Sequence, residues 1–417
     1  MSGTRMIAQA VEAFGGSLMS DPSVPYHVRS TLAKISMCGS THMGYDEWIC
    51  HDCGATETVN YHCGSRCCPY CNAMRREEWM LKRRDEMLPV HYFHCVFTVP
   101  ACLNVLYLQN RGGFCDALFR AAWGTLDAFG AKEDVKLGAL AVLHTWGRDL
   151  SVHPHVHVIC PPGGLNLKAL RGKDGARGEV RWKNLPNVKD EATGGYFLFP
   201  VKAMGEFFRG RFMALLTDEM DHIPADIRRQ CFEKPWVVFA KDTVTPRLAD
   251  ETDAEKAWTI LDYLGRYVYG NAIHEGRMRE VGDERVSFEY KSYKDGGATM
   301  IADLPGEEFV RRFAAHIPPK GFRKVRFYGF WSPRCREALA ALQEGMNVPR
   351  VPLKRGRMST ADILRALGKD PDRKRMCKCG GVLAMYYYPG DWKVILSRML
   401  QPGGQRDGPA PWNSAAS

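Results

Sequence analysis

The sequence lacks three features that would assign it to a membrane, to secretion or to the P-loop ATPases. No stretch of about eighteen apolar residues occurs, so we expect no membrane-spanning helix. The first residues, MSGTRMIAQAVEAFGG, do not contain the apolar core of a signal peptide. The phosphate-binding pattern G-x-x-x-x-G-K-[ST] is also missing. We therefore expect a cytoplasmic protein that carries no P-loop.

Acidic residues are fewer than basic ones. The chain has 57 Lys and Arg against 47 Asp and Glu, which gives a formal net charge of +10. This excess suits a polyanionic partner such as a nucleic acid. A length of 417 residues predicts two or three domains, and an apolar share of 45% can supply their cores.

Cysteine is concentrated near the start of the chain, where seven of the fifteen cysteines lie between Cys38 and Cys71. In a cytoplasmic protein such a cluster points to metal binding rather than to disulfides. Two C-x-x-C pairs at this separation are typical of a structural zinc site, because each pair gives two thiolates to one tetrahedral ion. The most economical site combines Cys50, Cys53, Cys68 and Cys71.

The remaining cysteines of this region could hold a second ion. We expect Cys38, Cys63 and Cys67 as its ligands, with His42 or Asp46 as a fourth. The alternative is that these three are free buried cysteines. The short pair Cys377-Lys378-Cys379 near the other end of the chain resembles a reduced zinc knuckle, but its spacing is wrong for a standard one.

A histidine-rich stretch, His153-Pro154-His155-Val156-His157, dominates the middle of the chain. The β-branched residues around it predict a strand, and alternate strand residues share a face. Neutral imidazole is a common metal ligand, so two imidazoles at i and i+2 can form one edge of a divalent metal site. The alternative is a strand with a polar, solvated face.

A third ligand can come from the preceding strand. Residues 137–146 are predicted to form a hairpin with the histidine strand through Gly147-Arg148-Asp149. A tight turn would place His144 opposite Val152, beside His153, whereas a longer loop would move it towards His155. His144 is therefore a candidate third ligand, and His153 is a weaker one.

A pair of tyrosines follows in a predicted helix over residues 254–274. Tyr263 and Tyr267 are four residues apart, so their hydroxyl groups lie on one helical face. Such a pair usually packs in a core. Together with a metal-binding strand in a basic protein, it also suits a phenolate that attacks a DNA phosphodiester and forms a 5′-phosphotyrosine.

Several basic side chains are candidates for contacts with DNA phosphate. They lie on a predicted helix over 72–88, around two strand-like runs at 284–291 and 298–303, and on a basic, aromatic strand over 321–331. The helix could instead be an ordinary solvated face, and the strand over 321–331 could be an ordinary edge strand. The candidates are Arg75, Arg76, Arg83, Lys291, Lys294, Arg323, Lys324 and Arg326.

These motifs together resemble the HUH-superfamily tyrosine transposases of rolling-circle insertion sequences, including the insertion sequence common region elements. The resemblance runs from about Arg29 to Arg336. It is carried by Tyr61-His62-Cys63, Cys67-Cys68-Pro69-Tyr70-Cys71, Leu88-Pro89-Val90, Tyr92-Phe93-His94, Leu143-His144-Thr145-Trp146-Gly147, the histidine stretch, Tyr263-Leu264-Gly265-Arg266-Tyr267 and Pro319-Lys320-Gly321-Phe322.

The resemblance implies roles for these residues. His155 and His157 would be ligands of a catalytic Mg²⁺ or Mn²⁺, and Tyr263 and Tyr267 would be the nucleophiles, with Tyr267 favoured if only one acts. The N-terminal cysteines would form a zinc-binding domain with one or two structural ions. This sequence departs from the family pattern at Asp46, at Cys67 and in the Cys377–Cys379 pair.

The implied fold class is α+β, with a central antiparallel sheet flanked by helices. The expected domains are a zinc-binding, DNA-binding domain (1–88), an HUH nuclease and strand-transferase domain (89–336), and a basic C-terminal region with a disordered tail (337–417). The implied partners are single-stranded and hairpin element ends, target DNA, and host replication or helicase proteins, at the nucleoid. A zinc-dependent DNA-binding regulator and a metal-dependent hydrolase that uses water are the two rival functions.

Overall fold

A computed structural model describes residues 5–171, 179–186, 188–189, 196–242, 265, 268–292, 296–349, 356–371 and 376–401. Its centre is a seven-stranded sheet in the order β10-β3-β5-β4-β6-β7, with β14 paired to the same edge of β4 as β6. Every pairing in this sheet is antiparallel. The strands are β3 (Phe93–Thr98), β4 (Val135–Trp146), β5 (Val152–Cys160), β6 (Gly163–Asn166), β7 (Trp182–Asn184), β10 (Val238–Asp242) and β14 (Val325–Gly329).

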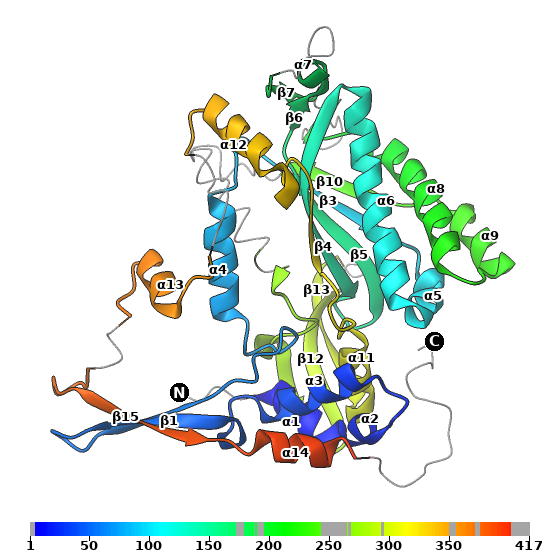
Figure 1. Cartoon of the computed structure of the whole chain (residues 1–417). Helices are drawn as coiled ribbons and strands as arrows, with labels where there is room; N and C mark the ends of the chain where they lie inside the picture. The colour runs from blue at the N-terminus through cyan, green and yellow to red at the C-terminus, as the bar shows by residue number, and fades with distance from the viewer. Residues whose placement is uncertain are drawn as a thin grey trace.

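Helices cover one face of this sheet (Figure 1). Alternation along β5 sends Val156 and Val158 to that face, where they join buried aromatic side chains such as Phe119 and Phe208 in one core. The covering helices are α5 (Asn104–Gln109), α6 (Arg111–Lys132), α8 (Val201–Glu219) and α9 (Ala225–Glu233). This arrangement confirms the predicted α+β class with an antiparallel sheet.

The opposite face of the sheet carries a second core. Val142 of β4 and Ile159 of β5 pack there with Tyr92, Val268 and Phe330. Two helices, α4 (Ala73–Arg84) and α12 (Arg336–Gly345), lie on this side of the sheet (Figure 1). The histidines of β5 alternate with its valines, so they point to this second face.

A third core joins segments that are far apart in the sequence. N-terminal residues such as Ile7 and Leu32 pack with Phe288 and Phe309, nearly 300 residues later. The elements that meet here are α1 (Met6–Phe14), α2 (Gly16–Ser20), α3 (Tyr26–Met37), β11 (Met278–Val281), β12 (Arg285–Ser292), β13 (Ala298–Pro305) and α11 (Gly306–Ala315).

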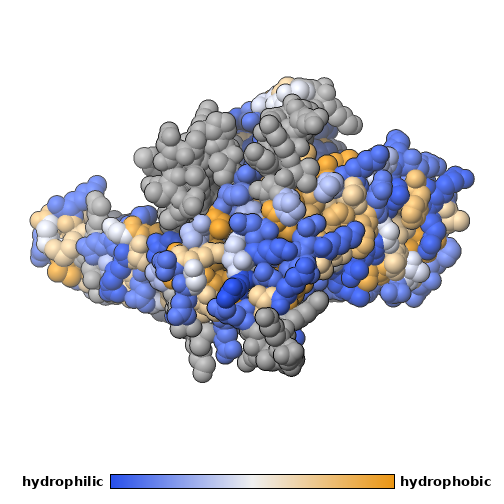
Figure 2. Space-filling model, turned by 90° about the horizontal axis from the view of Figure 1, so that it is seen from above, coloured by the Kyte–Doolittle hydropathy of each residue, from blue (hydrophilic) through white to orange (hydrophobic). Residues whose placement is uncertain are grey.

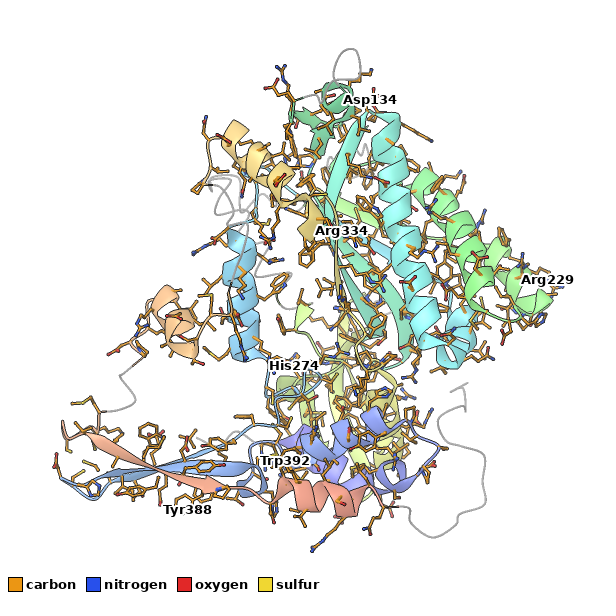
Figure 3. The ribbon with its side chains drawn as sticks, viewed as in Figure 1. Asp134, Arg229, His274, Arg334, Tyr388 and Trp392 are labelled. Atoms are coloured by element: carbon orange, nitrogen blue, oxygen red, sulfur yellow. The ribbon has the colours of Figure 1, made fainter. Side chains whose placement is uncertain are left out.

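A three-stranded ribbon projects from this part of the molecule (Figure 1). Its central strand is β1 (Gly44–Cys50), which pairs with β2 (Thr56–Asn60) on one side and with β15 (Leu383–Pro389) on the other. Tyr388 on β15 and Trp392, at the start of α14 (Trp392–Met399), lie near the base of the ribbon (Figure 3). The ribbon therefore combines residues of the expected N-terminal and C-terminal regions, whose division at 88 and 336 stays a prediction.

Two predicted segments differ from the structure. The helix expected over 254–274 falls largely outside the described residues, and its described end, residues 270–274, is not helical. The basic strand expected over 321–331 is shorter, because only the five residues of β14 pair with β4. In the described part of the chain, the remaining elements are α7 (Leu167–Arg171), β8 (Val188–Lys189), β9 (Tyr196–Phe197), α13 (Thr360–Ala366) and four short 3₁₀ turns. No helix in the described part of the chain is long and apolar enough to cross a membrane.

Candidate functional site

Three histidines from two neighbouring strands meet on the second face of the sheet. His144 on β4 lies directly opposite His155 on β5, because the register shifts by one residue between His144 and Trp146. This is the outcome predicted for the longer of the two possible connections. One ring nitrogen from each of His144, His155 and His157 lies within 4.8 Å of those of the others. We call these residues the histidine cluster.

Neighbouring groups hold two of these rings in place. His155 Nδ1 lies 2.7 Å from the backbone oxygen of His153. Since a carbonyl oxygen can only accept, Nδ1 carries the proton and Nε2 keeps its lone pair. His157 Nδ1 lies 2.8 Å from Nε2 of His94, on the adjacent strand β3. When His157 donates in this bond, its Nε2 also keeps the lone pair that a metal ligand needs.

Burial keeps the rings of His155 and His157 uncharged at neutral pH. It lowers the pKa of His155 to about 4 and that of His157 to about 2. The same cause lowers the pKa of His94 to about 4. Neutral imidazole is the form that binds metals, so the donor set fits a divalent cation with further oxygen ligands.

His153 occupies a different position from the one expected of a ligand. Its ring lies 5.1 Å from that of His155, on the same face of the strand, but outside the histidine cluster. Its contribution is the backbone oxygen that orients His155. The prediction that three histidines share a strand face is therefore confirmed, while the ligand role for His153 has no support in this geometry.

A cavity of about 440 Å³ borders Trp146, which packs on the histidine cluster, but none of the three histidines lines it. Trp146, which stacks on His144 with ring centroids 4.5 Å apart, forms part of its wall. Other aromatic and basic side chains complete it. They are Trp79, Tyr269, Phe322, Phe327, Arg66, Arg323 and Lys324.

Lys324 links this cavity to the segment after the predicted tyrosine helix. Its Nζ donates to the backbone oxygen of Gly270 at 2.8 Å and lies 4.6 Å from the centre of the Trp146 ring. Desolvation lowers the pKa of this lysine to about 7. A lysine with that pKa can carry a positive charge in the site when an anion binds nearby.

The tyrosines themselves, Tyr263 and Tyr267, lie outside the described residues. Their nearest described neighbours are Gly265 and Val268. Val268 is buried in the core on the histidine face of the sheet, with Leu140 and Val142. The Tyr269 ring packs edge-on against Trp79 of α4.

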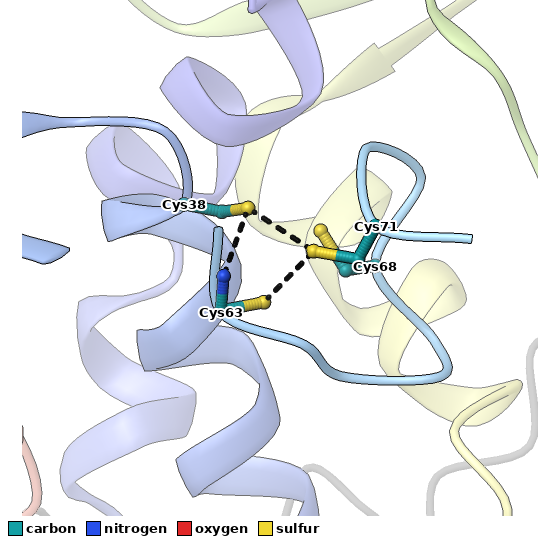
Figure 4. Close-up of side chains that lie close together, drawn as sticks. All are labelled: Cys38, Cys63, Cys68 and Cys71. Carbon is teal, nitrogen blue, oxygen red and sulfur yellow. Dashed lines mark hydrogen bonds between the residues drawn. The ribbon is translucent and has the colours of Figure 1, made fainter. Parts of the chain in front are cut away.

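The cysteines form two clusters, and the expected pairing of Cys50 and Cys53 with Cys68 and Cys71 is wrong. The first cluster joins Cys38, Cys63, Cys68 and Cys71 (Figure 4). In it, Cys71 Sγ lies 3.4 Å from Cys38 Sγ and 3.6 Å from Cys63 Sγ. The cause is the ribbon, whose strands carry Cys50 and Cys53 away from the buried turn that holds Cys68 and Cys71.

The first cluster is embedded in the core between α3 and the turn that precedes α4. Cys38 immediately follows α3, and its Sγ accepts a hydrogen bond from the backbone nitrogen of Cys63 at 3.4 Å. The contact between His62 and the thiols of Cys38 and Cys71 raises the pKa of His62 to about 10. A positively charged His62 would partly balance the negative charge of a thiolate shell.

The second cluster joins Cys50 and Cys53 to Cys377 and Cys379. The C-x-C spacing is still not that of a standard zinc knuckle, but the pair lies beside Cys50 and Cys53, a proximity that the sequence analysis did not predict. The sequence could have indicated this: Cys50-x-x-Cys53 and Cys377-x-Cys379 are both followed by glycine.

Three further zinc candidates lie elsewhere. Cys67 is outside both clusters and lies on the wall of the cavity, where burial raises its pKa. Asp46 accepts a hydrogen bond from the Tyr61 hydroxyl group. His42, the alternative fourth ligand, pairs with Asp391 at 3.0 Å. In the described structure, none of these three residues belongs to either cysteine cluster.

The predicted DNA-binding residues divide into two groups. Arg75, Lys291 and Arg323 are exposed, and Arg76 is half-buried. Two others are engaged within the protein. Arg83 pairs with Glu86 at 2.9 Å, and Arg326 pairs with Asp116 at 2.6 Å on the α6 side of the sheet. Lys294 lies outside the described residues.

Comparison with known proteins identifies the family. Residues 138–338 match a family model described as "Putative transposase", and residues 10–99 match a transposase zinc-binding domain of the IS91 type. The chain is 33% identical over 343 residues to "Putative transposase y4qJ" of Sinorhizobium fredii, covering 77% of this chain and 79% of that protein. The chain belongs to this transposase family.

A second relative of the transposase is more distant. It is the "Transposase for insertion sequence element IS801" of Pseudomonas savastanoi pv. phaseolicola, which is 26% identical over 354 residues. The alignment covers 83% of this chain and 81% of that protein. No solved structure matches the transposase. The zinc-binding match includes every cysteine of the first cluster but only half of the second, because it ends at residue 99.

Proposed function

We propose that this transposase nicks single-stranded DNA at the end of its element and transfers the cut strand to a target site. The observation that carries the proposal is the histidine cluster, which faces the core that also holds Val268, just after the tyrosine pair. Family membership supports a role in transposition, and DNA is then the partner. The chemistry proposed here is that of a phosphotyrosine intermediate.

In this mechanism the hydroxyl oxygen of Tyr267 or Tyr263 attacks the scissile phosphorus. A bond forms between that oxygen and phosphorus, and the bond to the 3′ oxygen breaks, which leaves a free 3′-hydroxyl group and a 5′-phosphotyrosine. The proton lost by the phenol balances the one gained by the 3′ oxygen. The DNA strand stays attached to the enzyme, so the energy of the phosphodiester is kept for rejoining.

The histidine cluster would hold one Mg²⁺ or Mn²⁺, which polarises the scissile phosphate when bound. The chain's own residues fix its place. The backbone oxygen of His153 orients His155, and His94 orients His157. Lys324, adjacent to the cluster, is suited to stabilise negative charge on the phosphate.

The cavity beside the cluster suits an unpaired nucleotide. Trp79 and Tyr269 line it with aromatic rings, and Arg66 and Arg323 lie at the same wall. Stacking of a base on an aromatic side chain contributes about 1–3 kcal/mol, and every base can use it. The combination favours single-stranded over double-stranded DNA, because paired bases are not free to enter such a cavity.

A covalent-adduct assay tests this function. The purified transposase is mixed with labelled single-stranded DNA from the element end and with Mg²⁺ or Mn²⁺, and the products are separated on a denaturing gel. We expect a shifted band that EDTA abolishes and that the double variant Tyr263→Phe, Tyr267→Phe does not form. Tyr26→Phe is the control and should still form the adduct, because Tyr26 is 63% exposed, lies on α3 and does not line the cavity.

Other outcomes distinguish the rival functions. Cleavage with a free 5′-phosphate and no adduct would identify a hydrolase that uses water. If the wild type and all variants bind the DNA but none cleaves it, the protein is a DNA-binding regulator. The two single tyrosine variants then assign the first nucleophile, for which Tyr267 is favoured.

A further inference from the structure

The second cysteine cluster is built from the two ends of the chain. Cys50 and Cys53 lie at the turn between β1 and β2, and Cys377 and Cys379 lie in the segment before β15. The four sulfur atoms are within 4.8 Å of one another, although the two pairs are more than 320 residues apart in sequence. The zinc-binding family match ends at residue 99, so it contains only one of the two pairs.

The distances between the sulfur atoms suit a metal rather than a disulfide. Cys50 Sγ lies 3.5 Å from Cys379 Sγ, and Cys53 Sγ lies 3.6 Å from Cys377 Sγ. A tetrahedral zinc ion with Zn–S bonds of about 2.3 Å sets its ligands about 3.8 Å apart. A disulfide would require about 2.05 Å. The four thiols thus have the separation of a zinc shell.

Both turns are shaped to present their sulfur atoms. In the first, Gly54 N donates to Cys50 O at 2.8 Å, and in the second, Gly380 N donates to Cys377 O at 2.9 Å. Gly54 and Gly380 have positive φ angles of 72° and 92°, which glycine adopts most easily. A Cβ atom on Gly381 would lie 2.9 Å from Cys50 Sγ, so a larger residue would displace a ligand.

We propose that Cys50, Cys53, Cys377 and Cys379 bind one structural zinc ion, which fastens residues 376–401 to the N-terminal zinc-binding domain. The shorter C-x-C pair can serve here because the other pair comes from a separate turn. With the first cluster, the transposase would hold two zinc ions. This inference does not depend on the proposed DNA chemistry.

The second cysteine cluster lies at the end of the ribbon where the C-terminal segment has little apolar burial, so a bound ion would stabilise it there. At the base of the ribbon, the C-terminal segment is held by several contacts: Asp391 pairs with His42, and the backbone oxygen of Leu400 accepts from Arg29 at 3.1 Å. The cluster lies at the other end, where β1 ends and β15 begins.

That outer end of the ribbon has little apolar burial. Val382 is 67% exposed and Met376 is 53% exposed. Seen from above, the projecting arm shows both hydrophilic and hydrophobic residues on its surface (Figure 2). A small sheet without a core of its own usually needs a metal or a disulfide to be stable.

Counting metal ions tests the proposal. Native mass spectrometry of the purified full chain, with zinc measured by elemental analysis, should give two zinc ions per chain. The double variant Cys377→Ser, Cys379→Ser should hold one. The control Cys102→Ser, Cys335→Ser also removes two cysteines, which are half-buried and lie outside both clusters, and it should keep two zinc ions.

A second measurement detects fastening of the C-terminal segment. Limited proteolysis should release fragments beginning near residue 376 faster from the Cys377→Ser, Cys379→Ser variant than from the wild type or the control. Two zinc ions in that variant, one in the wild type, or a mass loss of 2 Da from a disulfide in the wild type would each overturn the proposal. None of these readouts involves DNA, so they remain informative if the adduct assay fails.

Discussion

His94 lies on β3, next to the histidine strand, and its Nε2 is 2.8 Å from Nδ1 of His157. Groups that orient a metal ligand from behind typically change metal affinity by about 10–100-fold when they are removed. His94 was not among the predicted site residues. Phe93 and Cys95 flank it and are buried in the core on the helix face. Alternation along the strand therefore sends His94 to the histidine face, and this was the available signal.

The variant His94→Ala should weaken binding of Mn²⁺ to the histidine cluster by about 10–100-fold, because His157 loses its orienting partner. Isothermal titration with Mn²⁺ on the zinc-loaded protein measures this directly. His222→Ala is the control, since His222 is exposed and lies away from the cluster. Equal affinities for His94→Ala and the control would contradict an orienting role.

His316 predicts a dependence of stability on pH. Burial lowers its pKa from 6.5 to about 4, and its ring contacts Leu150 O and Thr145 Oγ1, each at 3.1 Å. Between these two pH values the unfolded chain binds more protons than the folded one. The contribution of His316 to the free energy of unfolding is therefore fully present above about pH 6.5. As the pH falls below that value, the free energy of unfolding decreases by at most about 1.4 kcal/mol per pH unit because of this residue.

Urea unfolding of the wild type and of His316→Gln at pH 7 and pH 5 measures this effect. We expect the wild type to lose about 2 kcal/mol more than the variant over this range. The other buried histidines are present in both proteins, so the difference isolates His316. His222→Gln should behave as the wild type does, and identical losses in His316→Gln and the wild type would refute the assignment.

At the scale of elements, the strand β14 and the residues before it contain one arginine that packs within the protein and one that is exposed at the cavity. Arg326 points to the α6 side, where it pairs with Asp116 at 2.6 Å and lies 4.3 Å from the centre of the Phe119 ring. Arg323, just before the strand, is exposed at the cavity. The sequence suggested the same DNA-binding role for both arginines, because it does not show which residue of the segment begins the strand.

The variants Arg326→Ala and Arg323→Ala should therefore behave differently. Arg326→Ala should lower the free energy of unfolding by about 1–2 kcal/mol, through loss of a half-buried ion pair and a cation–π contact. Arg323→Ala should leave stability unchanged and weaken binding of single-stranded DNA. Urea unfolding and fluorescence anisotropy measure the two effects, and a loss of DNA affinity only in Arg326→Ala would reverse this assignment.

At the scale of the whole molecule, the net charge of +10 can contribute to DNA binding where basic side chains lie together near the cavity. Arg66, Arg323 and Lys324 share the cavity wall, and Arg75 lies on the exposed side of α4. Four contacts to the phosphates of single-stranded DNA would give a slope of about −2.8 in a plot of log affinity against log salt concentration.

Affinity for single-stranded DNA should thus fall about 50-fold between 50 and 200 mM salt. Fluorescence anisotropy over a salt series measures the slope. Arg75→Ala should make it shallower by about 0.7. Arg229→Ala removes an exposed charge from α9, on the far side of the sheet (Figure 3), and should not change it. A slope near zero in the wild type would show that phosphate contacts contribute little.

Local patterns in the sequence were enough to predict several features of the site. Alternation predicted the face shared by His153, His155 and His157, and the turn residues predicted the hairpin that brings His144 beside them. The cysteine spacing predicted a zinc-binding domain, although not which cysteines lie together. These inferences succeeded because period, turn chemistry and ligand type are properties of short segments.

Which residues from distant parts of the chain lie together depends on the tertiary structure. A register shift of one residue placed His144 opposite His155, and strand pairing brought His94 to His157. The pairing of β15 with β1 joined Cys377 and Cys379 to the N-terminal turn. The physical reason is that partner choice across hundreds of residues depends on how sheets pair and cores pack, which no local pattern encodes.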